Sequence, residues 1–404
     1  MGASPKRILV FSIAYYPFVG GVEVALKEIT DRISPQEIEF HVLTLRIDSR
    51  LPKEEQIGNV VVHRIGFGRP GARAPELTTF PLRLNIYFYE LFAGLIALSL
   101  HWRYRFTAVW AMMAHTAGIP AAIFKTFYGR VPYLLTLQEG DPPEYIERLM
   151  RPVWPLFVRG FTKADYLQSI SSFLDRWGKR MGFKGEALVI PNGVDTARFT
   201  KEHDPAVLEG YRRKLNKQAS DIFLVTTSRL VYKNAIDDVI RALPLLPDNV
   251  SFIVYGIGPD EPKLRALTKE LGLTERVRFM GQIGHEEMPI ALKACDIFVR
   301  PSRSEGMGNS FVEAMAAGLP VIATQEGGIA DFLFDAEQNP GRPATGFAVH
   351  KDAPEEIAAA VKRILDNPEE VRKTTEVARA LAIERYDWGL IAGEMRSLFE
   401  RIVK

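Results

Sequence analysis

The segment from Ser304 to Val321 contains residue types whose spacing could do chemistry. Glu305 precedes a predicted helix, and Glu313 follows eight residues later within that helix. The amides of Asn309 and Ser310 stand where this helix would begin, and such amides bind anions because they lack intrahelical acceptors. The first carboxylate could then face a sugar while the second hydrogen-bonds a ribose. The spacing alone would equally fit two surface charges.

The segment from Ser228 to Asn234 offers positive charge for the same anion. Arg229 and Lys233 follow the predicted strand 223–227. Arginine presents a planar two-pronged donor and lysine a compact charge, so this pair could hold a diphosphate. Exposed basic residues after a strand are also common in solvated turns, and both interpretations remain open at this point.

Glycines accompany three turns that could carry a ligand. At the end of a strand in a parallel sheet, glycine lets the backbone approach a phosphate, although it serves a tight structural turn equally well. The glycines concerned are Gly20 and Gly21, Gly256 and Gly258, and Gly306 and Gly308.

The elements that would position these turns alternate between strand and helix. Short β-branched runs recur between helical patterns, which is typical of parallel sheets covered by helices. The expected strands are 8–13, 40–45, 60–65, 108–112 and 133–137, followed by 223–227, 251–255, 277–280, 297–300 and 320–324. A chain of 404 residues exceeds what one core supports, and segment 189–195, with its Pro-Asn-Gly turn, predicts a hinge. We therefore expect two α/β, doubly wound domains, 1–195 and 196–385, and a last helical segment, 386–404, that could cross back to the first.

Composition narrows the class of protein. The net charge of +2 without a basic stripe argues against nucleic-acid binding. The single cysteine, Cys295, precludes an internal disulfide, and residues 1–7 lead into a strand rather than a signal peptide, so we expect a cytoplasmic protein. The apolar run 84–100 contains Asn85 and Glu90, so we expect a buried helix rather than a membrane span. The alternative is that part of this helix faces a membrane or a lipid acceptor.

The segment around Glu305 resembles the retaining glycosyltransferases of family four. Their hallmark is a Glu, seven residues and a second Glu, followed by Ala-Met and Gly-x-Pro-Val, and every element is present between Glu305 and Val321. The resemblance extends over nearly the whole chain: Gly-Gly at 20, Pro-Asn-Gly-Val-Asp at 191, Arg-Leu-Val at 229, Gly-x-Gly-Pro at 256, Val-Arg-Phe-Met-Gly at 277 and Gly-Gly at 327. It implies the GT-B fold, in which two Rossmann-like domains face a cleft.

The resemblance also implies roles for the charged residues. Arg229 and Lys233 would bind the diphosphate of a nucleoside-diphosphate sugar, with the amides of the helix start assisting. Glu305 would contact the transferred sugar and Glu313 the ribose. The family's lysine usually stands one position later, where this chain has Asn234, so Lys233 would compensate.

Further residues gain roles from the same resemblance. The segment Met280 to Ile283 would pack around the base, and Gly20 and Gly21 would approach the reacting phosphate and the acceptor. The sequence has no compelling metal-ligand cluster, so we expect no metal and no cofactor. Retention would follow from attack on the same face, with the leaving phosphate accepting the acceptor's proton.

The acceptor side departs from the family pattern. Gln138 stands where a histidine that contacts the reacting sugar is often found, and glutamine cannot act as a general base. It can still donate a hydrogen bond to a sugar oxygen. His115, Glu139 and Asp141 are the other acceptor-side candidates, and a structural role for His115 is equally consistent with the sequence.

The expected function is a retaining, metal-independent, hexosyltransferase-like enzyme of polysaccharide biosynthesis. It would transfer a sugar from a nucleoside-diphosphate sugar to a glycan or lipid-linked acceptor, in the cytoplasm or at the inner face of the membrane. One alternative, motivated by Gln138, is a catalytically weak or inactive nucleotide-sugar-binding protein. A nicotinamide dehydrogenase is a weaker alternative, because Gly20 and Gly21 lack the third glycine of that fingerprint.

Overall fold

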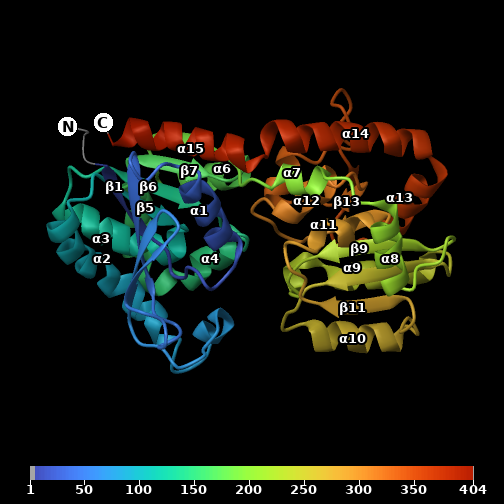
Figure 1. Ribbon diagram of the computed structural model, residues 1–404, viewed down its shortest axis with the longest axis horizontal. Coiled ribbons are helices and arrows are strands. Elements are labelled where there is room, and N and C mark those ends of the chain that lie inside the picture. Colours follow the sequence, from blue (N-terminus) through green and yellow to red (C-terminus); the bar gives the residue numbers. More distant parts are fainter. Residues whose placement is uncertain (1–4, 404) are drawn as a thin grey trace. The chain divides into compact units, whose positions relative to one another are not determined.

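The computed structural model describes residues 5–403, which form two compact units (Figure 1). The first unit extends to Asn192 and also includes the chain from Trp388 onward. The second unit is Gly193–Asp387. Each unit has its own sheet and its own hydrophobic core.

The first unit is built on an eight-stranded sheet in the order β3-β4-β2-β1-β5-β6-β7-β8. Its central strands are buried on both faces, as expected for a parallel sheet covered by helices. β3 alone pairs antiparallel, with β4 at the edge. The strands are β1 (Lys6–Phe11), β2 (Ile38–Leu45), β3 (Glu54–Ile57), β4 (Val60–Ile65), β5 (Ala108–Met112), β6 (Tyr133–Leu137), β7 (Tyr166–Ser169) and β8 (Glu186–Val189).

The last helix of the chain belongs to the core of this unit. The Phe399 ring of α15 lies 5.0 Å from the Trp110 ring and 5.6 Å from the Phe40 ring, between centroids. α15 therefore completes the first unit, although 195 residues of the second unit precede it. The helices are α1 (Gly21–Asp31), α2 (Leu84–Tyr104), α3 (Ile119–Phe127), α4 (Pro143–Leu149), α5 (Trp154–Thr162), α6 (Ser172–Arg180) and α15 (Trp388–Ile402).

The second unit has a six-stranded parallel sheet in the order β11-β10-β9-β12-β13-β14. Its strands are β9 (Ile222–Thr227), β10 (Val250–Tyr255), β11 (Val277–Gly281), β12 (Ile297–Arg300), β13 (Val321–Ala323) and β14 (Phe347–Ala348). The helices are α7 (Thr196–Thr200), α8 (Pro205–Lys214), α9 (Ile236–Ala242), α10 (Glu261–Glu270), α11 (Met288–Lys293), α12 (Asn309–Ala316), α13 (Pro354–Asp366) and α14 (Pro368–Arg385).

Both sheets reverse their strand order at one point, and that point determines where a ligand can bind. In the second unit the chain proceeds from β9 to β10 and β11 on one side, then returns to add β12 on the other side of β9. In the first unit the reversal lies between β1 and β5. Loops that leave neighbouring strands in opposite directions open a crevice at the carboxyl ends of the strands. The turns after β9 and β12, and those after β1 and β5, are therefore the places where a ligand is expected.

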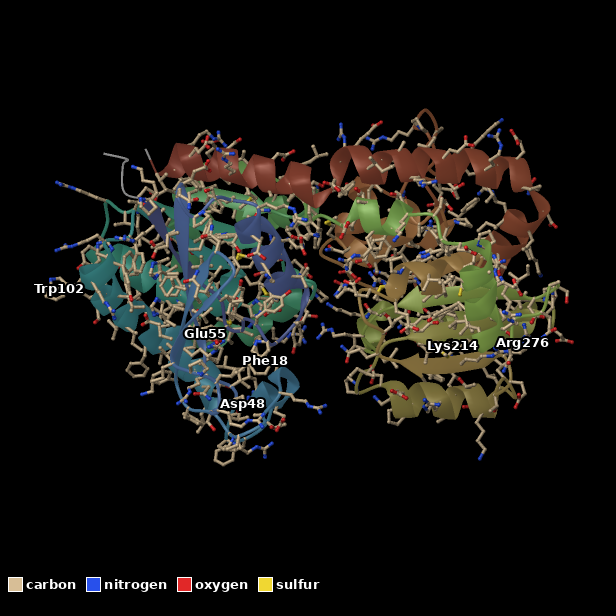
Figure 2. The ribbon with its side chains drawn as sticks, in the orientation of Figure 1. Phe18, Asp48, Glu55, Trp102, Lys214 and Arg276 are labelled. Carbon is tan, nitrogen blue, oxygen red and sulfur yellow. The ribbon has the colours of Figure 1, made fainter. Side chains whose placement is uncertain are left out.

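The expectation of two parallel α/β domains is confirmed, and all ten expected strands are present. The expectation that helix 84–100 is buried is wrong for one of its faces. α2 exposes large apolar side chains, and Figure 2 shows the labelled Trp102 projecting away from the ribbon. Apart from Tyr89, the helix buries small and polar residues, and Gly94 permits close packing on α3, whereas six large apolar residues are exposed on the outer side.

Candidate functional site

The turn after β9 holds Arg229 at the surface by means of its own backbone. The Asn234 side chain is buried and donates from Nδ2 to the Arg229 carbonyl oxygen at 2.6 Å. The Leu230 amide donates to the Ile257 carbonyl oxygen at 3.0 Å. Asn234 therefore closes the turn, which gives a structural reason for an amide side chain where the family resemblance would place lysine.

Gly256 and Gly258 let the loop after β10 pack closely against the same turn. A Cβ atom at Gly256 would lie 1.7 Å from the Ser228 carbonyl oxygen, and one at Gly258 would lie 2.2 Å from the Leu230 carbonyl oxygen. Gly256 also has a φ of +138°, which side-chain-bearing residues rarely adopt. These glycines do not line the pocket described below. Their role in this structure is the close packing of the loop after β10 on the turn after β9.

The start of α12 is an open helix terminus. Gly308 precedes it with a φ of +87°, and no side chain caps the helix. A Cβ atom at Gly308 would lie 2.5 Å from Cε2 of Phe311 and 2.8 Å from Nη2 of Arg300. The Asn309 side chain donates to the Gly193 carbonyl oxygen at 3.2 Å. Because the helix has no side-chain cap, its first amides can donate hydrogen bonds to an anionic ligand.

Arg300, the last residue of β12, organises the centre of the site. Its guanidinium donates to the Ser310 hydroxyl at 2.7 Å and to the Glu305 carboxylate at 3.0 Å. It also lies over the Phe311 ring, 4.1 Å from the centroid. Burial lowers the pKa of Arg300, and the charges of Glu305 and Glu313 raise it. An arginine remains charged in such surroundings, so the site contains a buried cation.

The two glutamates differ in what holds them. Glu305 binds Arg300, its Oε1 accepts the Gly306 amide at 3.2 Å, and its carbonyl oxygen accepts the Gly328 amide at 3.0 Å. Glu313 is half-buried beside the charge of Arg300. Burial raises the pKa of Glu313 to about 7, while Arg300 lowers it. Glu305 is thus fixed by the protein, whereas Glu313 is close to half-ionised at neutral pH.

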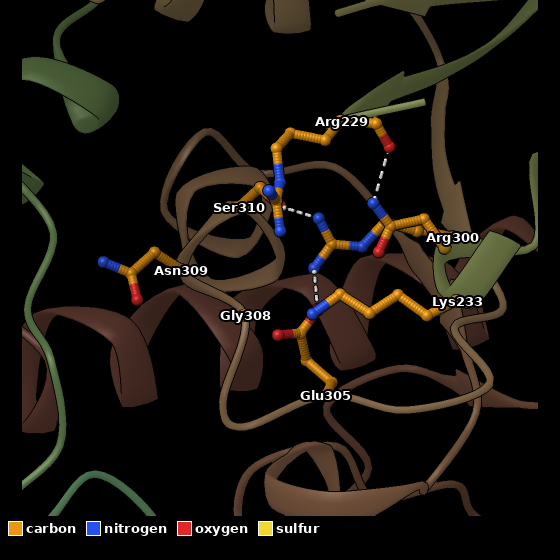
Figure 3. A pocket seen from close by; sticks show the side chains of 8 residues that line it. Arg229, Lys233, Arg300, Glu305, Gly308, Asn309 and Ser310 are labelled. Carbon is orange, nitrogen blue, oxygen red and sulfur yellow. Dashed lines mark hydrogen bonds and ion pairs between the residues drawn. The ribbon is translucent and has the colours of Figure 1, made fainter. Parts of the chain in front are cut away.

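The turn after β9, the end of β12 and the start of α12 line a pocket of about 170 Å³ (Figure 3). Three side chains that carry positive charge, Arg229, Lys233 and Arg300, line it together with the carboxylate of Glu305. The other lining residues are Asn234, Gly308, Asn309 and Ser310. Three cations and a helix start against one acid favour a ligand with at least two negative charges, such as a diphosphate.

Six of the residues singled out from the sequence line this pocket: Arg229, Lys233, Glu305, Gly308, Asn309 and Ser310. Gly306 and Glu313 do not line it. Sequence reasoning missed Arg300. A charged residue that ends a strand of otherwise apolar residues was the available signal, because its side chain must leave the core at the carboxyl edge of the sheet.

Met280 and Ile283 do not line this pocket, although both are partly accessible near the end of β11. Met280 is 39% exposed. A role of these two side chains in packing around a base stays a prediction.

In the first unit, the carboxylate of Glu23 lies at the turn after β1. α1 begins at Gly21, and a Cβ atom at Gly20 would lie 2.7 Å from Oε2 of Glu23. Burial raises the pKa of Glu23, and the amides of Gly20 and Glu23 itself lower it by hydrogen bonding to its carboxylate. The helix start at Gly20 is therefore occupied by an internal carboxylate.

The turn after β5 brings two of the acceptor-side candidates, His115 and Glu139, close together. Met113 has a φ of +74° and leads into η2 (Ala114–Gly118), a single π-helical turn. The Ala114 amide donates to Oε1 of Glu139 at 2.6 Å, and Nδ1 of His115 lies 3.5 Å from the same oxygen. Glu139 is fully buried, whereas the His115 side chain is 20% exposed. Strained backbone and π-turns concentrate at functional sites, so His115 and Glu139 form a candidate acceptor-side pair.

Glu90 of α2 is an ionisable residue near His115 that the sequence did not single out as functional. Burial raises its pKa to about 7, and the charge of His115 lowers it. Gln138 is buried, and its Oε1 accepts from Nδ2 of Asn192 at 3.4 Å. Asp141 is exposed. Among residues 5–403, no group of three or more His, Cys, Asp or Glu side chains has the geometry of a metal site.

Comparison with known proteins identifies relatives for both units. Residues 19–198 match the family model described as Glycosyltransferase Family 4, and residues 209–381 match that described as Glycosyl transferases group 1. A GDP-mannose-dependent monoacylated alpha-(1-6)-phosphatidylinositol monomannoside mannosyltransferase of Corynebacterium glutamicum is 28% identical over 251 residues. That match covers 59% of this chain and 63% of the relative, less than two thirds of its length.

Solved structures share the fold over nearly the whole chain. Sucrose-phosphate synthase from Thermosynechococcus elongatus superposes with a TM-score of 0.77 at 20% identity and covers 98% of this chain and 99% of its own. The Anabaena protein HepE in complex with UDP-glucose superposes with a TM-score of 0.74 at 20% identity, over 98% of this chain and 99% of its own.

Proposed function

This chain belongs to family 4 of the glycosyltransferases and has their GT-B fold, and we propose that it transfers a sugar from a nucleoside-diphosphate sugar to a glycan or lipid-linked acceptor. The reaction proceeds with retention and without a metal. One observation carries the proposal: Arg229, Lys233 and Arg300 converge with the start of α12 on one pocket that contains a fixed acid, Glu305.

The cations stabilise the leaving group. When the bond between the sugar's anomeric carbon and the β-phosphate oxygen breaks, negative charge grows on the diphosphate. Arg229 and Lys233 bind that charge, and the start of α12 adds its amides. These protein groups supply the positive charge that the leaving diphosphate needs, so the proposal assigns no step to a metal ion.

The two glutamates bind the parts of the donor at either end of the diphosphate. Glu305, fixed by Arg300, accepts hydrogen bonds from hydroxyls of the transferred sugar. Glu313, which makes no side-chain hydrogen bond within the described part of the chain, accepts hydrogen bonds from the ribose. The pKa of about 7 that burial gives Glu313 makes this contact sensitive to pH.

Retention follows from attack on the face that the diphosphate leaves. The acceptor oxygen forms the new bond to the anomeric carbon, and its proton passes to the departing phosphate oxygen. No protein base is required, which accommodates Gln138 in place of a histidine. His115, held beside Glu139, and Gln138 position the acceptor hydroxyl.

The acceptor class rests on the name of one relative. The Corynebacterium relative is named for a phosphatidylinositol mannoside, which supports a lipid-linked acceptor here. We place the enzyme in the cytoplasm, at the inner face of the membrane. The UDP-glucose complex of HepE supports a nucleoside-diphosphate sugar as the donor.

Two measurements on one protein sample test this function. Thermal-shift titration with UDP, GDP, ADP and CMP sugars should identify one donor that raises the melting temperature, because a ligand bound to the folded state stabilises it. The same donor should then release nucleoside diphosphate during turnover. Arg229→Met should remove both signals, whereas Arg241→Met, also an exposed arginine of the second unit but outside the pocket, should preserve both.

A nucleotide-sugar-binding protein without transferase activity is the second candidate, and the observation that favours it is Gln138. Such a protein would give the thermal shift without release of nucleoside diphosphate for any acceptor. Nuclear magnetic resonance of the anomeric proton in the product distinguishes retention from inversion.

A further inference from the structure

Helix α2 (Leu84–Tyr104) exposes large apolar side chains that a helix of a soluble domain usually buries. Its buried residues are mostly small or polar, whereas six large apolar residues are 44–74% exposed. The buried residues are Asn85, Tyr89, Glu90, Ala93, Gly94, Ala97 and His101. The exposed ones are Leu84, Tyr87, Leu91, Phe92, Leu95 and Trp102.

Packing inside the first unit explains the buried face. A Cβ atom at Gly94 would lie 2.6 Å from the Pro120 carbonyl oxygen of α3, so small residues are required there. The Tyr89 hydroxyl donates to the Leu43 carbonyl oxygen at 2.7 Å. The Asn85 side chain accepts the Phe67 amide at 3.1 Å. None of these contacts involves the outer face, so the fold of this unit does not explain the residues exposed there.

The exposed apolar residues follow one side of the helix, and the exposed Ser99 lies between Leu95 and Trp102. Leu84, Tyr87, Leu91 and Leu95 follow each other at intervals of three or four residues, which places them along one side of the helix. The Phe92 ring stacks on that of Phe88 at 5.1 Å between centroids. At a rise of 1.5 Å per residue, this row of exposed residues extends about 17 Å from Leu84 to Leu95 and about 27 Å from Leu84 to Trp102. Soluble proteins rarely expose apolar surface of this extent without a partner.

Charge identifies the partner. Glu90 is the only acid in α2, and it is buried, so the exposed side of the helix carries no negative charge. Arginines stand at both ends: Arg83 before the helix, and Arg103 and Arg105 at its C-terminus, all exposed. Trp102, 74% exposed, lies beside the latter two. Apolar residues with a tryptophan and arginines at their margin match the acyl and headgroup layers of an anionic lipid surface.

We propose that the outer face of α2 docks on an anionic lipid bilayer, with the helix in the plane of the membrane surface and Arg83, Arg103 and Arg105 on lipid phosphates. The proposed function includes a membrane contact, and α2 is the surface that we assign to it. The inference rests on the proposed function only in taking the acceptor to be lipid-linked.

Two other occupants fit less well. α2 is long and apolar enough to cross a membrane by length and composition, but its inner face is packed on the first unit with Asn85 and Glu90 buried. Crossing would expose that carboxyl to lipid and remove a helix from the fold. A second copy of the chain on the same face would bring arginines together, which costs affinity. α2 supplies no exposed acid to pair them, and Glu54 of β3 already lies 4.0 Å from Arg103.

The test is co-sedimentation of the full chain with vesicles. The wild type should bind vesicles of phosphatidylcholine and phosphatidylserine at least about tenfold more strongly than vesicles of phosphatidylcholine alone, because surface cations attract anionic lipid. Trp102 should shift its fluorescence to shorter wavelength on binding. Leu91→Glu with Leu95→Glu should reduce binding at least about tenfold, since both charges would enter the acyl region.

A matched double variant controls for the added charge. Leu245→Glu with Leu390→Glu also replaces two leucines that are 44% and 48% exposed, neither of them on α2, and should retain binding. Melting temperatures verify that both variants fold. Equal binding by the two variants, or a dimer in solution that Leu91→Glu with Leu95→Glu dissociates, would overturn the inference. The thermal shift that the donor produces in the same samples separates the two proposals, because a failure of docking leaves donor binding in the second unit intact.

Discussion

The guanidinium of Arg300 donates to the carboxylate of Glu305 at 3.0 Å, and the two side chains are 6% and 14% exposed. The same guanidinium reaches the Ser310 hydroxyl at 2.7 Å, so one planar group links the loop before α12 to the first turn of that helix. A buried ion pair of this kind fixes geometry more than it adds stability. Arg300 therefore determines where Glu305 points.

Arg300→Lys should weaken binding of the nucleoside diphosphate by about 10- to 100-fold, because lysine cannot donate to Glu305 and Ser310 at once and a charge-assisted hydrogen bond contributes about 1.5–3 kcal/mol. Isothermal titration calorimetry measures the change. Arg241→Lys, a substitution on the surface of the same unit, is the control. An affinity equal to that of the wild type would show that Arg300 does not organise the site.

Glu313 should make ribose recognition dependent on pH. Burial raises the pKa of Glu313 to about 7, so its carboxylate form, which accepts hydrogen bonds more strongly, is lost as the pH falls through that value. The affinity of the preferred nucleoside should fall by up to about tenfold per pH unit below about pH 7. The affinity should be measured with the nucleoside, because it carries no phosphate group whose own protonation would change in this pH range. Glu313→Gln should give weak binding that does not change with pH.

The sequence predicts most of the fold and three charged residues of the pocket, but not Arg300 at its centre. Glu305, Arg229 and Lys233 stand in turns after strands, where composition is informative. Arg300 ends an apolar strand, and only the strand order, with β12 next to β9, shows that its side chain meets the turn of Arg229.

Helix α2 could not be oriented from sequence for a related reason. Both of its faces are rich in apolar residues, so periodicity does not distinguish the face that packs on α3. Gly94 and Ala97 were the available signal, because small residues permit helices to approach closely. The role of Asn234 likewise depended on the backbone, since its amide closes a turn that the sequence does not specify.

Gly308→Ala should destabilise the second unit and weaken donor binding. Gly308 has a φ of +87°, and a Cβ atom there would collide with Phe311 and Arg300. Gly318→Ala is the matched control, because Gly318 has a φ of +83° and a Cβ atom added there would meet no heavy atom within 4 Å. Gly318→Ala should cost about 1–2 kcal/mol for backbone conformation alone. Gly308→Ala should cost at least about 1 kcal/mol more in denaturant unfolding.

Only Gly308→Ala should also reduce the thermal shift produced by the donor, since its collision moves Arg300. Equal losses of stability with equal thermal shifts in the two variants would mean that the Gly308 contacts do not support the site.

Glu90 should make the stability of the first unit fall as the pH rises. Burial raises its pKa from 4.5 to about 7, with the charge of His115 as an opposing effect. Between these two values the folded state retains a proton that the unfolded chain has lost, so the free energy of unfolding decreases with pH, by up to about 3 kcal/mol in all.

Glu90→Gln has no carboxyl to ionise at this position. We therefore expect the variant to be more stable than the wild type at about pH 8 and to lose that advantage at about pH 4, where Glu90 is protonated in both states. Denaturant unfolding across this range measures the difference. Glu394→Gln, an exposed glutamate of α15 in the same unit, should show no such crossover. A constant difference between Glu90→Gln and the wild type at every pH would mean that Glu90 is ionised in the folded protein, and its burial would then have to be offset by a partner such as His115.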